Sequence, residues 1–170
     1  MEIRPVRPDE YDALGEITLR AYRELFGQPL GSYGSELLDV ERRDRDSEVF
    51  VAVDDDDDEH RIVGGVTYVP GPGRTMSEFI DPDAAGIRML AVDPSRQGEG
   101  AGLALTNWCI ERARSAGRRR VVLHSTPIMT TAHGIYERLG FMRSPQLDEW
   151  VEESPDADEP LHLMSFTLEL

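Results

Sequence analysis

The sequence predicts a single α/β domain, in which a mixed sheet of six to seven strands is flanked by about four helices. Short segments rich in β-branched residues alternate with longer ones whose apolar residues recur every three to four positions. The 170 residues suit one domain with one sizeable core, and neither an internal repeat nor a linker divides them. We therefore expect residues 1–170 to form one domain.

The first half of the chain is expected to hold three strands and two helices. Leu14, Ile17, Ala21 and Leu25 define one helical face, and Gly27 is a typical residue to end it. The expected elements are a strand over 2–6, a helix from 9 to 27, a more polar helix over 33–44, and strands over 48–53 and 61–69.

The second half continues the alternation. Ala132, Ile135, Tyr136 and Leu139 share one helical face, and Gly140 follows them. The expected elements are a strand over 86–92, a helix over 100–116, a strand over 120–125, a helix over 132–139, a strand beginning at 141–143, and a last strand over 162–170.

The charge of the chain is strongly negative. There are 33 acidic residues against 18 basic ones, giving −15, and every basic residue is an arginine. This balance weighs against nucleic-acid binding and against an anionic membrane surface, because both need a basic footprint. The acids of residues 54–59 predict a solvated hairpin loop, since they lack the spaced ligands and turn glycine of an EF-hand calcium site.

Cys109 is the only cysteine, which excludes an internal disulfide and a thiolate metal cluster. Its apolar neighbours predict a buried core thiol. No segment approaches the length of a membrane span, and the N-terminus has no apolar leader region. We therefore expect a cytoplasmic protein that does not bind a membrane.

The most informative segment is the glycine-rich stretch that joins the strand over 86–92 to the next helix. Glycines alternate at Gly98, Gly100 and Gly102, so the backbone can approach a ligand closely, and the helix start offers free N–H groups to phosphate. A P-loop is excluded because no lysine follows the last glycine. A dinucleotide-binding loop fits poorly because the spacing differs and the motif comes late in the chain.

Three motifs together resemble the GCN5-related N-acetyltransferase (GNAT) family. Residues 97–102, Gln-Gly-Glu-Gly-Ala-Gly, are similar to the family's Arg/Gln-x-x-Gly-x-Gly/Ala loop. Residues 87–94 resemble the strand before that loop, and residues 132–141 resemble the late helix ending in Tyr-x-x-x-Gly-Phe. The resemblance covers nearly the whole chain, and the order of elements also agrees with it.

This resemblance implies a mostly antiparallel, twisted sheet that is splayed by a bulge at the central cofactor strand. It also implies acetyl-CoA as cosubstrate, with its pyrophosphate on the loop amides and its pantetheine arm on the backbone of Leu90 and Val92. The implied cofactor-binding residues are Leu90, Ala91, Val92, Gln97, Gly98, Glu99, Gly100, Ala101 and Gly102. No metal is expected. Met129 stands where family members often carry a cofactor-contacting asparagine.

The reaction implied by the resemblance is direct attack of a primary amine on the thioester. Tyr136 matches the family's tyrosine that protonates the departing thiolate, although a core tyrosine would show the same pattern. The base stays open between His124, loop carboxylates at Glu78, Asp81 and Asp83, and relayed water. Arg96 and the arginines at 118–120 are candidate phosphate partners, with solvated surface arginines as the alternative.

The charges are unevenly distributed along the chain. Residues 86–147 hold nine arginines and four acids, whereas the remainder holds nine arginines and 29 acids. An anionic coenzyme therefore suits the basic part, and a cationic amine acceptor suits the acidic part.

Two other functions remain open at this point: an acyltransferase that uses a different acyl-CoA donor, and a non-catalytic acyl-CoA-binding sensor or interaction module. Because many members of the family dimerise, a homodimer is open as well. The acceptor itself has no recognisable signature in the sequence.

Overall fold

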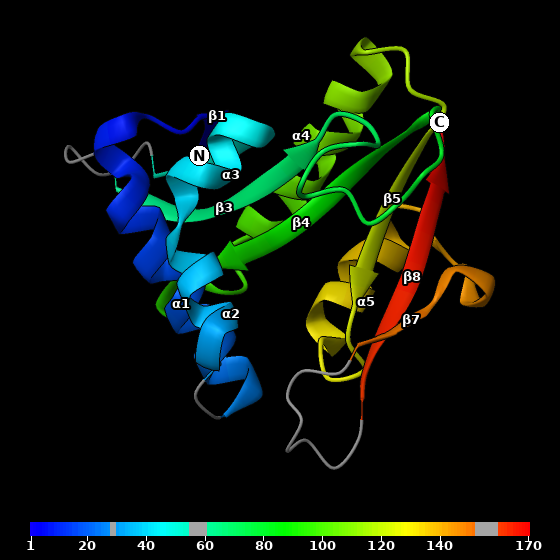
Figure 1. Cartoon of the computed structure of the whole chain (residues 1–170). Helices are drawn as coiled ribbons and strands as arrows, with labels where there is room; N and C mark the ends of the chain where they lie inside the picture. The colour runs from blue at the N-terminus through cyan, green and yellow to red at the C-terminus, as the bar shows by residue number, and fades with distance from the viewer. Residues whose placement is uncertain (28–29, 55–60, 152–159) are drawn as a thin grey trace.

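The protein is described by a computed structural model that covers residues 1–27, 30–54, 61–151 and 160–170. One twisted sheet runs through the molecule, with helices on both of its faces (Figure 1). The acidic run over 55–59 and most of the second acidic segment lie outside the described residues. The hairpin loop expected over 54–59 and the rejected calcium site are therefore not addressed by the structure.

The described sheet has the order β1-β2-β3-β4-β5-β8-β6, and β7 pairs with the outer part of β8. All pairs are antiparallel except β4 with β5. The strands are β1 (Glu2–Pro5), β2 (Glu48–Val53), β3 (Ile62–Val69), β4 (Ala84–Val92), β5 (Arg120–Ser125), β6 (Met142–Arg143), β7 (Glu149–Val151) and β8 (Leu161–Glu169). The predicted fold class, a mixed and mostly antiparallel sheet with flanking helices, is confirmed, and the short strand β7, which was not predicted, raises the number of described strands to eight.

Five α-helices are described: α1 (Tyr11–Phe26), α2 (Gly31–Leu38), α3 (Val40–Asp46), α4 (Ala101–Ser115) and α5 (Thr130–Arg138). The helix predicted over 33–44 is two helices. Asp39 leaves the helical conformation at φ −80°, ψ 68°, and its carboxylate accepts a hydrogen bond from the Arg42 N–H as the N-cap of α3. The break lets the Arg43 side chain turn back and donate to the Leu37 carbonyl at the end of α2.

The helices divide the core between two faces of the sheet. The α4 face is built from Leu105, Cys109, Leu123 and Phe166 with their neighbours, and the thiol of Cys109 is fully buried as predicted. The opposite face, here called the α1 face, packs α1 and α2 against β3 and β4 through residues such as Leu19, Tyr22 and Met89. Among the described residues, no helix is both long and apolar enough to cross a bilayer.

A bulge in β4 changes which side chains reach each face. The pairing of β3 with β4 shifts between Gly65 and Thr67, where β4 holds one additional residue. Met89 takes a left-handed conformation at φ 49°, which is rare for a residue other than glycine. As a result Arg88 and Met89 both face α1, whereas Leu90 packs on the α4 face.

Candidate active site

The two central parallel strands separate at the bulge. Residues of β4 and β5 pair only as far as Ile87 and Leu123, and beyond that point the strands diverge (Figure 1). The Asp93 N–H donates to the Val63 carbonyl of β3. Because N–H groups alternate between the two edges of a strand, those of Val92 and Leu90 point away from β3, into the opening between β4 and β5.

Ala91 is placed differently from its two neighbours. It lies opposite Gly65 in the β3 pairing, so its N–H points to β3, and its side chain is buried on the α1 face. Of the three predicted strand residues, Leu90 and Val92 therefore direct their backbone N–H groups into the opening, while the N–H of Ala91 is directed to β3.

The glycine-rich loop ends at an uncapped helix N-terminus. Gly98 and Gly100 have φ values of 88° and 90°, a region that other residues adopt with strain. Gly100 is the N-cap residue of α4 and supplies no side-chain hydrogen bond, and the Ala104 N–H is the one that bonds back to its carbonyl. Within the part of the chain that the structure describes, the N–H groups of residues 101–103 are thus left for an external acceptor, at the positive end of the helix dipole.

The remaining loop residues differ in exposure. Gln97, Gly98, Glu99 and Gly100 are exposed, whereas Ala101 and Gly102 are buried in the first turn of α4. A Cβ at Gly102 would lie 3.1 Å from the Ile135 Cδ1 atom of α5, so glycine permits the close approach of these helices. The Glu99 carboxylate is held by Arg96, which also binds Asp54 at 2.5 Å.

Three of the arginine candidates, Arg96, Arg118 and Arg120, bind other groups of the protein. Arg96 forms two ion pairs, with Asp54 and Glu99. Arg118 donates to the Pro82 carbonyl, and Arg120 binds Asp81 and Glu169. These last two residues follow the C-terminal end of α4, whereas the glycine loop precedes its N-terminal end, so they lie away from the loop by the length of a 15-residue helix.

Tyr136 is a buried residue of α5 within the core of the α4 face. Its ring contacts Phe141 and Phe166 at centroid distances of 5.7 and 5.6 Å, and the residue is 5% exposed. Its hydroxyl has no hydrogen-bond partner among the described residues, and burial raises the pKa of Tyr136 well above its ordinary value. The phenol is therefore protonated at neutral pH and has a proton to donate.

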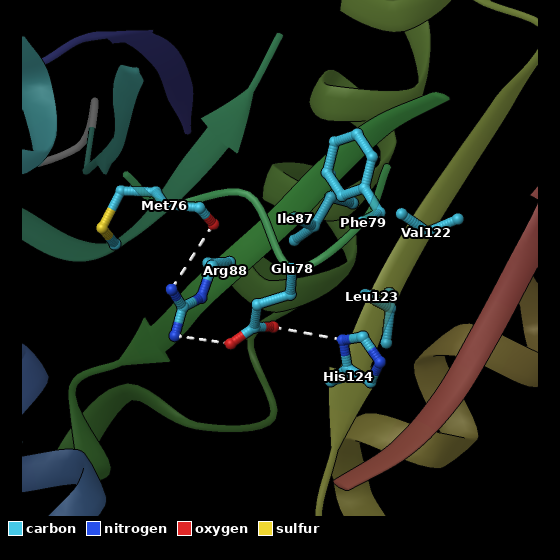
Figure 2. A pocket seen from close by; sticks show the side chains of 9 residues that line it. Met76, Glu78, Phe79, Ile87, Arg88, Val122, Leu123 and His124 are labelled. Carbon is cyan, nitrogen blue, oxygen red and sulfur yellow. Dashed lines mark hydrogen bonds and ion pairs between the residues drawn. The ribbon is translucent and has the colours of Figure 1, made fainter. Parts of the chain in front are cut away.

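Glu78, Arg88 and His124 meet on the α1 face beside the opening (Figure 2). The Glu78 carboxylate binds Arg88 at 2.8 Å and the His124 Nδ1 atom at 3.1 Å. Burial favours the neutral acid, but the hydrogen bond from His124 and the charge of Arg88 outweigh it, so the pKa of Glu78 is lowered. Burial likewise opposes the charged imidazole, but the bond to Glu78 outweighs it and raises the pKa of His124.

The contacts of His124 oppose a role as the base. Its Nε2 atom lies 3.3 Å from the Leu147 carbonyl, which can only accept, while Nδ1 faces a carboxylate with a lowered pKa. Both ring nitrogens therefore face hydrogen-bond acceptors, which favours the imidazolium form and opposes a free lone pair on the ring. Glu78 lies between two cations, which makes it a weak proton acceptor. The other loop carboxylates belong to Asp81 and Asp83, which contact the segment after the C-terminal end of α4: Arg120 binds the Asp81 carboxylate, and the Arg119 N–H donates to the Asp83 carbonyl.

This network gives a pH-dependent prediction. The pKa of His124 should lie above 6.5 and should fall in Glu78→Gln, as measured by proton NMR of the imidazole. Asp83→Asn, in the same loop, is the control and should leave the pKa of His124 unchanged.

The same pKa shifts predict how the stability of the fold depends on pH. The raised pKa of His124 contributes stability below pH 6.5, and this contribution is lost as the pH rises. The lowered pKa of Glu78 contributes stability above about pH 4.5, and this contribution is lost as the pH falls. The network should stabilise most between these values, and a neutral ring at pH 6 would contradict it.

A larger hollow on the α1 face was not predicted from the sequence. It has a cavity volume of about 210 Å³ and opens to solvent between α2, α3 and β4. Met76 and Arg88 line both this hollow and the small pocket of Figure 2, so the two are neighbours beside the β4 bulge. The sequence shows its arginines in the polar segment 33–44, but nothing local indicates that they converge with β4.

Met129, His133 and Ser125 form a small group at the start of α5. The Ser125 hydroxyl lies 3.1 Å from the His133 Nε2 atom and 3.3 Å from the Met129 sulfur. Met129 thus occupies the place expected from the sequence, near the N-terminus of α5, with a thioether where an amide is common. Among the described residues, no group of three or more His, Cys, Asp or Glu side chains is arranged to hold a metal ion.

The splayed sheet, the bulged strand and the glycine-led helix define an acetyltransferase-type domain. The sequence model of the acetyltransferase (GNAT) family matches residues 11–141, and the chain belongs to that family.

Two curated relatives are similar to parts of the chain. N-acetyltransferase 8B of Homo sapiens is 32% identical over 88 residues, which is 52% of this chain and 37% of that protein. Mycothiol acetyltransferase of Geodermatophilus obscurus is 41% identical over 63 residues, which is 36% of this chain and 20% of that protein. The chain thus spans well under half the length of these relatives.

Among solved structures, one from Salmonella typhimurium, determined with its cofactor acetyl-CoA, has a TM-score of 0.70 at 20% identity. The alignment covers 100% of this chain and 94% of that one. The likeness confirms the fold over the whole chain.

Proposed function

We propose that this protein is an N-acetyltransferase that moves the acetyl group of acetyl-CoA to a primary amine by direct attack. The observation that carries the proposal is the juxtaposition of the Leu90 and Val92 N–H groups, facing the opening, with the uncapped N-terminus of α4 at the end of the same strand. Pantetheine contains amides and coenzyme A a pyrophosphate, and these two sets of donors match them in order.

In this proposal the loop residues 97–102 bind the pyrophosphate and the strand residues 90–92 hold the pantetheine arm. Gly98 and Gly100 contribute their backbone freedom, and Ala101 and Gly102 contribute N–H groups of the first helical turn. The side chain of Gln97 is exposed and can reach the ligand. The Glu99 carboxylate accepts hydrogen bonds from Arg96 and balances its charge, so its role is to position Arg96 beside the loop.

The chemistry forms one C–N bond and breaks one C–S bond. The neutral amine nitrogen attacks the thioester carbon, and an N–H group of the splayed strand stabilises the developing oxyanion; such donors contribute about 3–4 kcal/mol. Tyr136 then donates its phenolic proton to the departing thiolate, which leaves as free coenzyme A, and the tyrosinate regains a proton from water. The amine's proton goes to water, since both ring nitrogens of His124 face hydrogen-bond acceptors and Glu78 contacts both Arg88 and His124.

A thiol-release assay with two acyl-CoA donors tests this function and has three possible outcomes. The purified chain is mixed with a panel of primary amines and with acetyl-CoA or succinyl-CoA, and the release of free thiol is followed. We expect thiol release with acetyl-CoA that depends on the amine. Turnover with succinyl-CoA alone would assign a different donor, and coenzyme binding with no thiol release would favour the non-catalytic sensor.

A further inference from the structure

The hollow on the α1 face carries more positive charge than the chain's overall charge of −15 suggests. Three arginines line it, Arg42, Arg43 and Arg88, together with two carboxylates. Asp39 already accepts the Arg42 N–H as the cap of α3, and Arg88 pairs with Glu78. The remaining acid, Glu36, lies on exposed α2. The hollow thus offers cationic donors toward its interior.

Arg43 is the unusual member of this group. The residue is 2% exposed, and among the described residues it forms no ion pair. Its two Nη atoms donate to the Leu37 carbonyl and the Thr67 hydroxyl, both neutral, and its Nε–H has no partner. A buried cation without a counter-ion is costly, so such a charge normally has an anionic partner. Burial lowers the pKa of Arg43 to about 10, which still leaves it charged at neutral pH.

The hollow also reaches the reacting part of the proposed site. Met89 and Arg88 line it, and they are the two bulge residues that immediately precede Leu90 of the cofactor strand. A molecule seated among the arginines would therefore extend toward the opening in which the thioester is proposed to lie. The cavity volume of about 210 Å³ is below the range of drug-sized ligand sites, so the hollow suits a small acceptor.

We propose that the acceptor is a small primary amine that also carries an anionic oxygen group, a carboxylate or a phosphate, and that Arg42 and Arg43 bind this group. This inference rests on the proposed function, because it specifies the acceptor of that reaction. The forked guanidinium suits both oxyanions. The arrangement places the anionic end between α2 and α3 and directs the amine along β4 toward the bulge.

The first test compares acceptors that differ only in the anionic group. The common amino acids are assayed against their C-terminal amides, and O-phosphoethanolamine against ethanolamine, with acetyl-CoA in excess. We expect kcat/KM to be about 10- to 100-fold higher for the anionic member of one pair type, the range given by hydrogen bonds to a charged group. The pair that shows the preference identifies carboxylate or phosphate as the group.

Two neighbouring arginines of α3 supply matched variants. Arg42 is exposed and lines the hollow, whereas Arg45 is exposed on the same helix and pairs with Glu41. Arg42→Gln should remove most of the preference for the anionic acceptor, and Arg45→Gln should retain it, with unchanged melting temperatures in both. Arg43 gives a second pair of variants. Arg43→Met removes the charge and should lose the preference for the anionic acceptor, whereas Arg43→Lys keeps a charge and should retain part of that preference.

The outcomes separate this inference from the proposed function. Equal rates with acids and amides, or a preference unaffected by Arg42→Gln, would overturn the anionic acceptor while leaving acetyl transfer intact. If no amine is acetylated, the proposed function fails, and calorimetric titration of the same compounds without coenzyme decides the site alone. Binding of the anionic member that weakens in Arg42→Gln but not in Arg45→Gln supports the oxyanion site, and equal binding by all three proteins rejects it.

Discussion

Gly100→Val is expected to abolish acetyl-CoA binding, with affinity falling at least about 100-fold. Valine at φ 90° would be strained by about 1–2 kcal/mol, and its side chain would project into the open space beside the first turn of α4. The loop would have to rearrange, and the N–H groups of residues 101–103 would lose their alignment. Isothermal titration calorimetry with acetyl-CoA measures the effect.

The chain contains a matched control for this substitution. Gly117 follows the other end of α4 and has φ 71°, and a Cβ added there would likewise meet nothing within 4 Å. Gly117→Val should suffer similar strain and a similar loss of stability but should retain coenzyme affinity. Wild-type affinity in Gly100→Val would reject the loop as the phosphate site. An equal loss in both variants would assign the effect to general destabilisation.

Tyr136→Phe is expected to lower kcat by about 100-fold or more, the range of general acid catalysis, while coenzyme affinity stays nearly constant. Phenylalanine keeps the ring contacts with Phe141 and Phe166 and removes a hydroxyl that has no partner among the described residues. The melting temperature should therefore be unchanged or slightly higher, which separates a catalytic effect from a folding defect.

The pH profile gives a second measure of the same role. Because burial raises the pKa of Tyr136, the phenol should stay protonated across the neutral and mildly alkaline range, and it should impose no loss of rate there. Wild-type turnover in Tyr136→Phe would defeat the assignment as general acid and leave the residue as a core tyrosine.

The regular elements were predictable because their signals are local. The helix over 101–115 and the strand over 120–125 follow from apolar spacing and from glycines that end the helices. The break at Asp39 was missed because a capping aspartate inside a polar helical pattern resembles any other exposed acid. Strand β7 was missed because three exposed residues in an acidic segment carry little pattern.

The residues of the site likewise fall into those that could be predicted from the sequence and those that could not. The glycine loop and Leu90 to Val92 are contiguous in sequence, so a motif could point to them. Glu78, Arg88 and His124 come from a loop and two strands, and their contact depends on the parallel pairing of β4 with β5. The hollow around Arg43 depends further on how α2 and α3 turn against the sheet, which no local pattern contains.

The bulge at Met89 makes β4 two strand segments of opposite phase. Before it, Ala85 and Ile87 face α4; after it, Leu90 and Val92 do. Deleting Met89 would restore a regular strand, and Ala85, Ile87, Leu90 and Val92 would then all keep their place on the α4 face. The packing of the core is therefore compatible with a regular strand, and deletion of Met89 should be tolerated by the fold while it closes the opening beside β5 and weakens acetyl-CoA binding.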